Sequence, residues 1–212
     1  MRVTSARSGG FGAVVVLGVA LILPAVAAAP PGNAQAAAPA AASLVSLTID
    51  PAQSQVHWTV PSSLHTVHGT FAVTRGSMSF DPDSGQASGE IVVNAKSGES
   101  GNGSRDARMH KEILETAKFP EAVFRPTLVE GKVSPRGGCE VKVRGTLSVH
   151  GSNHEITALV HAELAGTTWK GSGKFDVPYV DWGIKDPSNF LLRVNHVVSV
   201  EIELSGSLEP AQ

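Results

Sequence analysis

Apolar and polar residues alternate in short runs from Ser46 to the end of the chain. A two-residue period is typical of β-strands, because successive side chains point to opposite faces of a sheet. The most regular run is Val198–Leu204, in which apolar residues fill every second position and Ser or Glu fills the others. We expect this strand to have one buried and one solvated face, as strands of antiparallel sheets commonly do.

The whole pattern predicts about eight to nine strands, several of them bounded by Gly or Pro. We place them at residues 56–60, 71–73, 78–80, 89–95, 122–129, 139–148, 155–164, 168–177 and 194–208. The segment Asp81–Gly85 has the residues of a tight turn, with Pro82 suited to its second position. Many antiparallel strands are typical of a barrel or of a sandwich, and the period does not separate these two all-β folds.

One segment has a different period. Between residues 103 and 119 the apolar residues recur at helical spacing, which predicts one short helix. Either Ser104 or Asp106 can cap its N-terminus, and Pro120 ends it.

The first 36 residues have the composition of a secretory signal peptide. Arg2 and Arg7 are the only charges, and small residues follow the apolar run Val14–Leu23. This run has ten residues, whereas a membrane-spanning helix needs about twenty, so a retained anchor is the weaker interpretation. We therefore expect a periplasmic or secreted protein whose mature chain has no membrane span.

Residues 28–43 are rich in Ala and Pro and carry no charge, which predicts a flexible leader rather than a packed element. We divide the chain into a signal peptide at 1–36, a flexible leader at 37–45 and one β-domain at 46–210. A domain of this length is large enough to bury one core.

Charge and cysteine content exclude several classes of function. Removal of the signal peptide would leave 15 basic and 19 acidic residues, a net charge of −4, which argues against a nucleic-acid partner. Cys139 is the only cysteine, so no disulfide can form within the chain. It has no neighbouring catalytic signature, and the sequence has no G-x-S-x-G motif, so we do not expect an enzyme.

Five motifs follow one another in a characteristic order along the domain. They are LTIDPAQSQVHWTV, TVHGTF with GSMSFDPDSG, SRDARMHKEILETAKFPEAVF, RGTLSVHGSNHEITALV and FDVPYVDWGI. Together they resemble the YceI-like family of exported bacterial proteins, and the resemblance extends from about Leu47 to Leu208. The motifs come from separate parts of the chain, which makes their combination specific.

The resemblance implies an eight-stranded antiparallel, lipocalin-like barrel with one short helix near the opening. It implies non-catalytic binding, carriage or storage of a long isoprenoid lipid, of the quinone or polyprenyl type, in the cell envelope. An isoprenoid lipid is then the expected partner, and no cofactor is required. The alternative is metal binding through histidines, or an envelope stress or interaction module with a filled barrel. The sequence leaves open whether the domain forms a homodimer.

Alternation within the expected strands indicates which side chains face the barrel interior. We place eight of them on the pocket: Phe71, Val73, Met78, Phe80, Ile91, Trp169, Phe175 and Trp182. For any single one, ordinary core packing is the simpler explanation. Arg105, Asp106 and Met109 lie on the helix near the entrance, where an Arg-Asp pair more often caps a helix than binds a head group.

Two other features leave alternatives open. The 22 glycines of the chain either leave room for a ligand or relieve crowding where a sheet coils tightly. Two pairs of histidines, His65 with His68 and His150 with His154, are close in sequence. On a strand, residues three apart face opposite ways and residues four apart stand roughly 13 Å apart, so we assign no metal ligands.

Overall fold

The computed structural model describes residues 44–134 and 137–209. The expected signal peptide at 1–36 and residues 37–43 of the expected leader lie outside the described residues. Across 44–134 and 137–209, no helix combines the length and the hydropathy needed to cross a bilayer.

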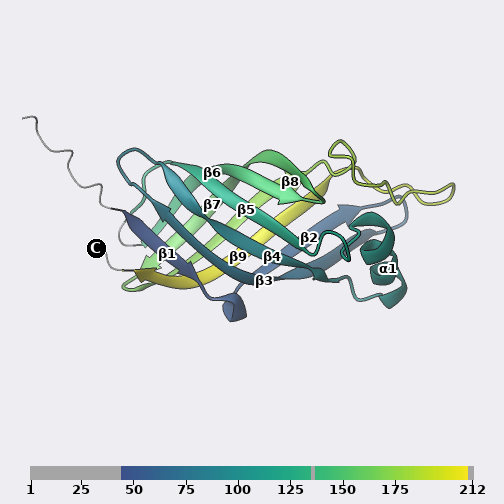
Figure 1. Ribbon diagram of the computed structural model, residues 1–212, viewed down its shortest axis with the longest axis horizontal. Coiled ribbons are helices and arrows are strands. Elements are labelled where there is room, and N and C mark those ends of the chain that lie inside the picture. Colours follow the sequence, from purple (N-terminus) through teal and green to yellow (C-terminus); the bar gives the residue numbers. More distant parts are fainter. Residues whose placement is uncertain (1–43, 135–136, 210–212) are drawn as a thin grey trace, which may run out of the picture. The chain divides into compact units, whose positions relative to one another are not determined.

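Within these residues the chain forms nine strands, which belong to one antiparallel sheet (Figure 1). They are β1 (Val45–Ile49), β2 (Gln55–Pro61), β3 (Thr66–Phe80), β4 (Ala87–Glu99), β5 (Glu121–Glu130), β6 (Gly137–Val149), β7 (Ser152–Ala165), β8 (Thr168–Val177) and β9 (Val198–Glu209). The β8 strand has the bounds predicted from alternation, and most of the others extend a few residues beyond them.

The sheet closes on itself. From β3 to β9 each strand pairs with the next, and β1 and β2 both lie between β3 and β9. The first of them pairs with residues 77–80 and 206–209, and the second with residues 66–72 and 199–203. Since β1 and β2 share one position, the barrel has eight strand positions. This confirms the expected eight-stranded antiparallel barrel and rules out the sandwich.

A short 3-10 turn, η1 (Pro51–Gln53), separates β1 from β2. Asp50 Oδ1 accepts a hydrogen bond from Ala52 N at 2.9 Å, and Ser54 Oγ donates to Asp50 O at 2.7 Å. On β9, Ser205 N donates to Ser54 Oγ at 3.1 Å. These bonds satisfy polar groups at the break, so pairing with β9 resumes directly after it.

The two predicted strands at 71–73 and 78–80 belong to one strand, β3. Its register against β4 shifts between Val73 and Arg75. An extra residue at such a bulge changes which residues face inward, from odd to even numbers in this case. The change of phase explains why the sequence pattern indicates two short strands.

The expected helix is present but shorter than predicted. It comprises α1 (Gly103–Arg108) and a π-helical segment, η2 (Met109–Ile113). The cap is Asn102, whose Oδ1 accepts from Arg105 N at 3.1 Å, so both caps predicted from the sequence were wrong. Asn and Ser are comparable as caps, and the sequence therefore did not distinguish between them.

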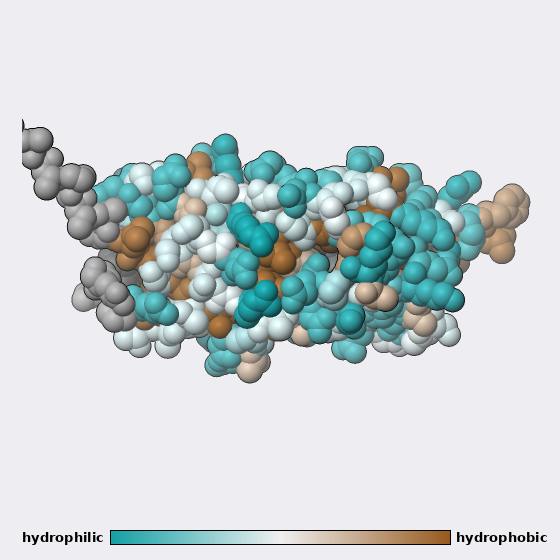
Figure 2. All heavy atoms as spheres, in the orientation of Figure 1, coloured by the Kyte–Doolittle hydropathy of each residue, from teal (hydrophilic) through white to brown (hydrophobic). Residues whose placement is uncertain are grey.

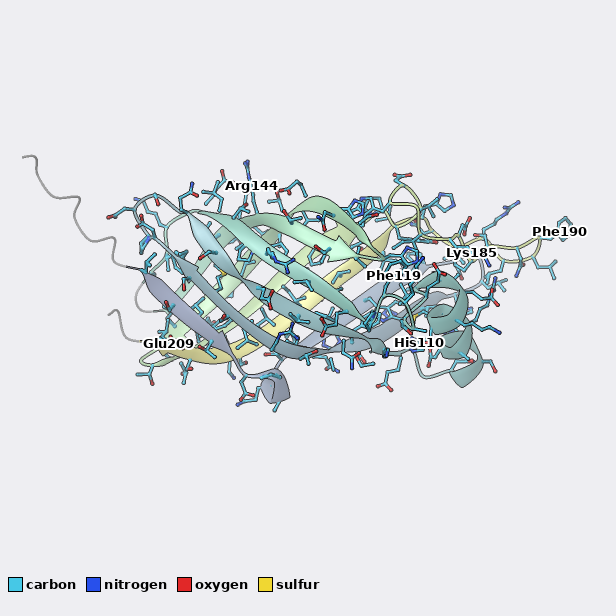
Figure 3. All side chains as sticks on the ribbon, viewed as in Figure 1. His110, Phe119, Arg144, Lys185, Phe190 and Glu209 are labelled. Atoms are coloured by element: carbon cyan, nitrogen blue, oxygen red, sulfur yellow. The ribbon has the colours of Figure 1, made fainter. Side chains whose placement is uncertain are left out.

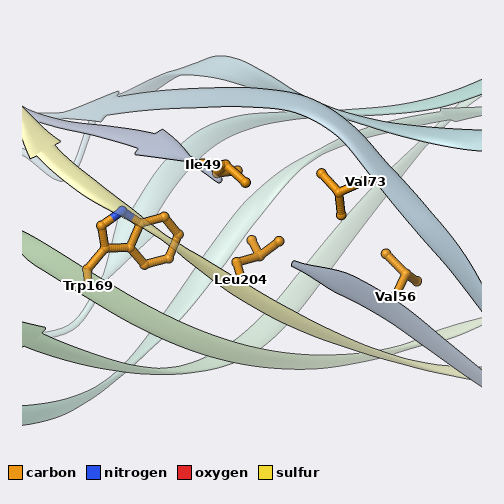
Figure 4. Packing of buried hydrophobic residues seen from close by; sticks show 5 residues of the cluster. All are labelled: Ile49, Val56, Val73, Trp169 and Leu204. Atoms are coloured by element: carbon orange, nitrogen blue, oxygen red, sulfur yellow. The ribbon is translucent and has the colours of Figure 1, made fainter. Parts of the chain in front are cut away.

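Buried apolar side chains fill part of the barrel in two clusters. The first contains Ile49, Val56, Val73, Trp169 and Leu204 (Figure 4). The second contains Phe80, Val129, Val141 and Val143. The first cluster joins β1, β2 and β3 with β8 and β9, from the two ends of the domain, and the second joins the end of β3 with β5 and β6.

Aromatic rings of the interior lie against glycines. A Cβ atom on Gly69 would stand 2.3 Å from Trp58 Cε2 and 2.3 Å from Glu99 O. A Cβ atom on Gly206 would stand 1.8 Å from Thr48 O and 2.9 Å from Trp169 Nε1. At these two positions the glycine relieves crowding around an indole ring.

We expect Gly69→Ala to lower the free energy of unfolding by about 1–3 kcal/mol, because the added methyl group overpacks against Trp58 and a backbone oxygen. Gly103→Ala is the matched control, since a Cβ there would meet no atom within 4 Å. Chemical denaturation of both variants measures the difference. Equal stability of the two variants would contradict this account of Gly69.

Candidate functional site

The barrel encloses a cavity of about 500 Å³, within the range of roughly 300–1,000 Å³ that is typical of ligand sites. Strands on all sides of the barrel contribute to its lining. Their apolar side chains include Val56, Val60, Val67, Phe71, Val73, Ile91, Val93, Ala122, Phe124, Leu147, Ile156, Ala158, Phe175, Val177, Val198, Val200, Ile202 and Leu204. Such a lining favours an apolar ligand.

A second cavity of about 110 Å³ lies in the same barrel. Side chains of β1 and the ends of β3, β5 and β6 line it, together with Trp169. Five residues belong to the linings of both cavities: Ile91, Phe124, Ala158, Ile202 and Leu204. The two spaces are therefore neighbours, separated by one layer of apolar side chains.

Seven of the eight side chains predicted to face the pocket line these cavities. Phe71, Val73, Ile91 and Phe175 line the larger one, and Met78, Phe80 and Trp169 line the smaller one, to which Ile91 also belongs. Their contact with a ligand stays a prediction.

Trp182 is the exception, because it lies in a turn rather than on a strand. Trp182 N donates to Pro178 O at 3.2 Å, and Ile184 N donates to Tyr179 O at 3.0 Å. This turn directs Tyr179 and Ile184 to the cavity, while the Trp182 ring stacks on His154 with centroids 4.0 Å apart. Alternation, which applies to strands, could not predict that orientation.

The three helix residues predicted near the entrance also differ in whether they line the cavity. Arg105 and Met109 line the larger cavity, and Asp106 does not. The Ser100 hydroxyl donates to Asp106 Oδ1 and accepts from Arg105 Nε, which lies 2.7 Å away. Burial opposes ionisation of Asp106, but the Ser100 hydrogen bonds and the Arg105 charge outweigh it and lower the pKa of Asp106. This pair therefore fixes the helix to the end of β4.

Further contacts hold the helix near the cavity. A ring nitrogen of His110, Nε2, lies 2.8 Å from Gly98 O, which ties η2 to β4. Glu112 Oε2 lies 3.3 Å from Lys185 Nζ and 3.5 Å from Arg108 Nε. Figure 3 shows His110 and Lys185 at the same end of the barrel as the helix. The loop after β8 and the helix together form this end.

Two hydrogen-bond donors on the cavity wall were missed by the sequence reasoning. Trp58 and Tyr179 both line the larger cavity and are 8% and 6% exposed. Among the described residues, neither Trp58 Nε1 nor the Tyr179 hydroxyl has a hydrogen-bond partner. Buried donors without partners cost free energy, and both donor atoms are buried within the wall, so an acceptor in the cavity would reach them only after the side chains shift.

The Tyr179 hydroxyl remains a neutral donor over a wide range of pH. Burial, and then the nearby charge of Asp186, raise the pKa of Tyr179 to about 12. The indole N–H of Trp58 does not titrate in this range. The wall of the larger cavity thus contains two neutral donor groups and no charge at these two positions.

Three of the four histidines considered as metal ligands lie against other side chains. His68 Nδ1 is 2.9 Å from Thr59 Oγ1, and His150 Nε2 is 3.0 Å from Glu115 Oε2. The His154 ring stacks on Trp182. In the part of the chain that the structure describes, no three His, Cys, Asp or Glu side chains are placed to hold a metal ion.

These features define a lipocalin-like barrel: a closed antiparallel sheet, an apolar internal cavity, and a helix and loop at one end. Comparison with known families gives the particular class. The family model of the YceI-like domain matches residues 47–209. The chain belongs to the YceI-like family, as its five motifs predicted.

The solved structures similar to this chain include the following two. BcnA from Burkholderia cenocepacia has a TM-score of 0.61 and 16% identity, covering 75% of this chain and 99% of that one. A polyisoprenoid-binding domain from Saccharophagus degradans, implicated in plant cell wall breakdown, has a TM-score of 0.59 and 19% identity, covering 77% and 98%. The likeness at these identities is one of fold. No curated protein matches the chain.

Tyr179 is the only tyrosine of the chain, so tyrosinate absorbance reports on it alone. We expect it to ionise with a pKa of about 12 in the folded protein, above its ordinary value of 10.0. The associated stability is fully present below about pH 10 and is lost as the pH rises towards the folded-state value. A spectrophotometric pH titration of folded and denatured protein measures both values, and coincident midpoints would contradict the burial of this hydroxyl.

Proposed function

We propose that the protein binds a long isoprenoid lipid inside its barrel and carries or stores it in the cell envelope without catalysis. The observation that carries the proposal is the apolar cavity of about 500 Å³. Membership of the YceI-like family supports it, as does the fold shared with a polyisoprenoid-binding domain. The signal-peptide pattern at residues 1–36 supports a location in the envelope.

The energetics favour a ligand that is apolar along most of its length. Each methylene group removed from water contributes about 0.8 kcal/mol, and a prenyl chain has many such groups. Ordering a flexible chain offsets part of this gain. A tail that fills the cavity needs no charged anchor along it, and the lining side chains of the strands provide none.

We further propose that the ligand has a neutral head group with a hydrogen-bond acceptor, as a quinone has. Tyr179 and Trp58 offer donors that have no partner among the described residues. The two arginines of the lining are already engaged, because Arg105 donates to Ser100 and Arg108 pairs with Glu112. A diphosphate would need cations that are free to approach it, so these contacts favour a quinone over a prenyl diphosphate.

The proposal is tested on protein purified from its native host by organic extraction and mass spectrometry. We expect a prenyl lipid from the wild-type protein and none from Ala158→Phe, because Ala158 lies between the two cavities and is 3% exposed. The matched control is Leu159→Phe, whose side chain is 48% exposed. This variant should retain the lipid.

Overpacking at Ala158 costs about 1–3 kcal/mol, so circular dichroism must first show that the variant is folded. Ala95→Leu adds bulk elsewhere in the larger cavity and serves as a second variant. A wild-type protein that carries no prenyl lipid and takes up neither added quinone nor polyprenol would contradict the proposal.

Tyr179→Phe tests the head group. We expect it to weaken binding of a prenylated quinone by about 2- to 10-fold, the value of one hydrogen bond of roughly 0.5–1.5 kcal/mol. Binding of an isoprenoid hydrocarbon with the same tail should be unchanged, and fluorescence titration measures both ligands. Equal losses for the two ligands would show that Tyr179 only shapes the cavity.

A further inference from the structure

Exposed apolar side chains gather at one end of the barrel. Among the described residues, Phe190, Leu191 and Leu64 are the most exposed large hydrophobic side chains, at 93%, 80% and 71%. Figure 3 shows Phe190 at the tip of a loop that extends beyond the strands, and Figure 2 shows hydrophobic atoms at that tip. Exposure of this degree is unfavourable in water, so the protruding side chains call for an explanation.

The loop tip is held in a defined conformation. Asn189 Oδ1 accepts hydrogen bonds from Leu191 N and Leu192 N, both at 2.9 Å. Asn189 N donates to Leu192 O at 2.8 Å. This turn presents Phe190 and Leu191 outward, so little conformational entropy would be lost if a partner buried them.

The loop between β2 and β3, residues 62–65, is hydrogen-bonded to the loop that carries Phe190. Ser63 N donates to Arg193 O at 2.8 Å, and Arg193 N donates to Ser63 Oγ at 3.1 Å. Ser62 and Val194 form an adjacent bridge between the loops. Leu64, next to Ser63, therefore belongs to the same protruding unit as Phe190 and Leu191. We call these three residues the apolar tip.

The apolar tip lies next to the cavity. The same two loops contribute Ser62, His65, Leu192 and Val194 to the lining of the larger cavity. Each loop thus has residues on the cavity wall and, one or two positions away in the sequence, a residue of the apolar tip. Whatever surface buries the tip will also meet the end of the cavity.

Charge distinguishes this end from the rest of the domain. Residues 103–119 and 178–197 contain six cations and five carboxylates, whereas the remainder of 44–209 contains nine cations and fourteen carboxylates. Arg193, beside the tip, is in no ion pair of the described residues. An anionic surface would repel the negatively charged barrel wall more strongly than this end. The protein would therefore approach such a surface with this end first.

We propose that the apolar tip inserts into the surface of a lipid bilayer and so docks the cavity against the membrane. Three side chains on narrow loops can enter the boundary between headgroups and acyl chains. They cannot alone form the roughly 800 Å² per partner of a standard protein interface. The docking proposal depends only on the apolar tip. Passage of an isoprenoid from the bilayer to the cavity depends in addition on the proposed function.

The test is cosedimentation of the protein, as its native host produces it, with vesicles of phosphatidylethanolamine and phosphatidylglycerol. We expect the triple variant Leu64→Ser, Phe190→Ser, Leu191→Ser to bind about tenfold or more weakly than the wild type. Leu159→Ser is the matched control, since Leu159 is an exposed leucine on a strand of the barrel wall. It should bind as the wild type does.

Two outcomes would overturn the proposal. One is equal vesicle binding by the wild type and the triple variant, including no binding by either. The other is a wild type that self-associates in sedimentation analysis through the tip and does not bind vesicles, which would assign the tip to a second copy of the chain. Mass spectrometry of lipid extracts from the same variants separates docking from ligand binding: vesicle binding without a bound isoprenoid would contradict only the proposed function.

Discussion

Closure of the sheet is the constraint on which the rest of the structure depends. Every strand position has a hydrogen-bonded neighbour on both sides, and β1 and β2 complete the circle between β3 and β9. A closed barrel of eight strand positions has an interior wide enough to fill with side chains or to hold one small ligand. In this barrel two buried clusters occupy part of the interior and cavities occupy the rest.

Alternation located the strands well because it depends only on which residues face the core. It could not show closure, since pairs such as Leu47 with Leu208 join residues far apart in the sequence. Nor could it follow the bulge after Val73, where the inward face changes phase. The family resemblance implies a barrel, and the pairing between strands distant in sequence shows how the sheet closes.

The candidate site was predictable to the extent that it lies on strands. Side chains such as Phe71 and Phe175 follow the alternation and line the larger cavity. Tyr179 was missed because it lies in the turn after β8, where backbone hydrogen bonds rather than strand period decide which side chains face inward. Trp182 lies in the same turn, where alternation does not apply. Unpaired donors, in addition, are visible only when their surroundings are known.

The layer of side chains between the two cavities has a consequence for selectivity. The donors Trp58 and Tyr179 belong to the larger cavity, which the end loops also line, and the smaller cavity lies beyond Ile91, Phe124 and Ala158. A tail short enough to end before this layer would leave the core packing undisturbed. A longer tail must push apart close-packed side chains to advance. If the proposed lipid binds in the larger cavity, this layer of side chains would limit the length of tail that the barrel accepts without rearrangement.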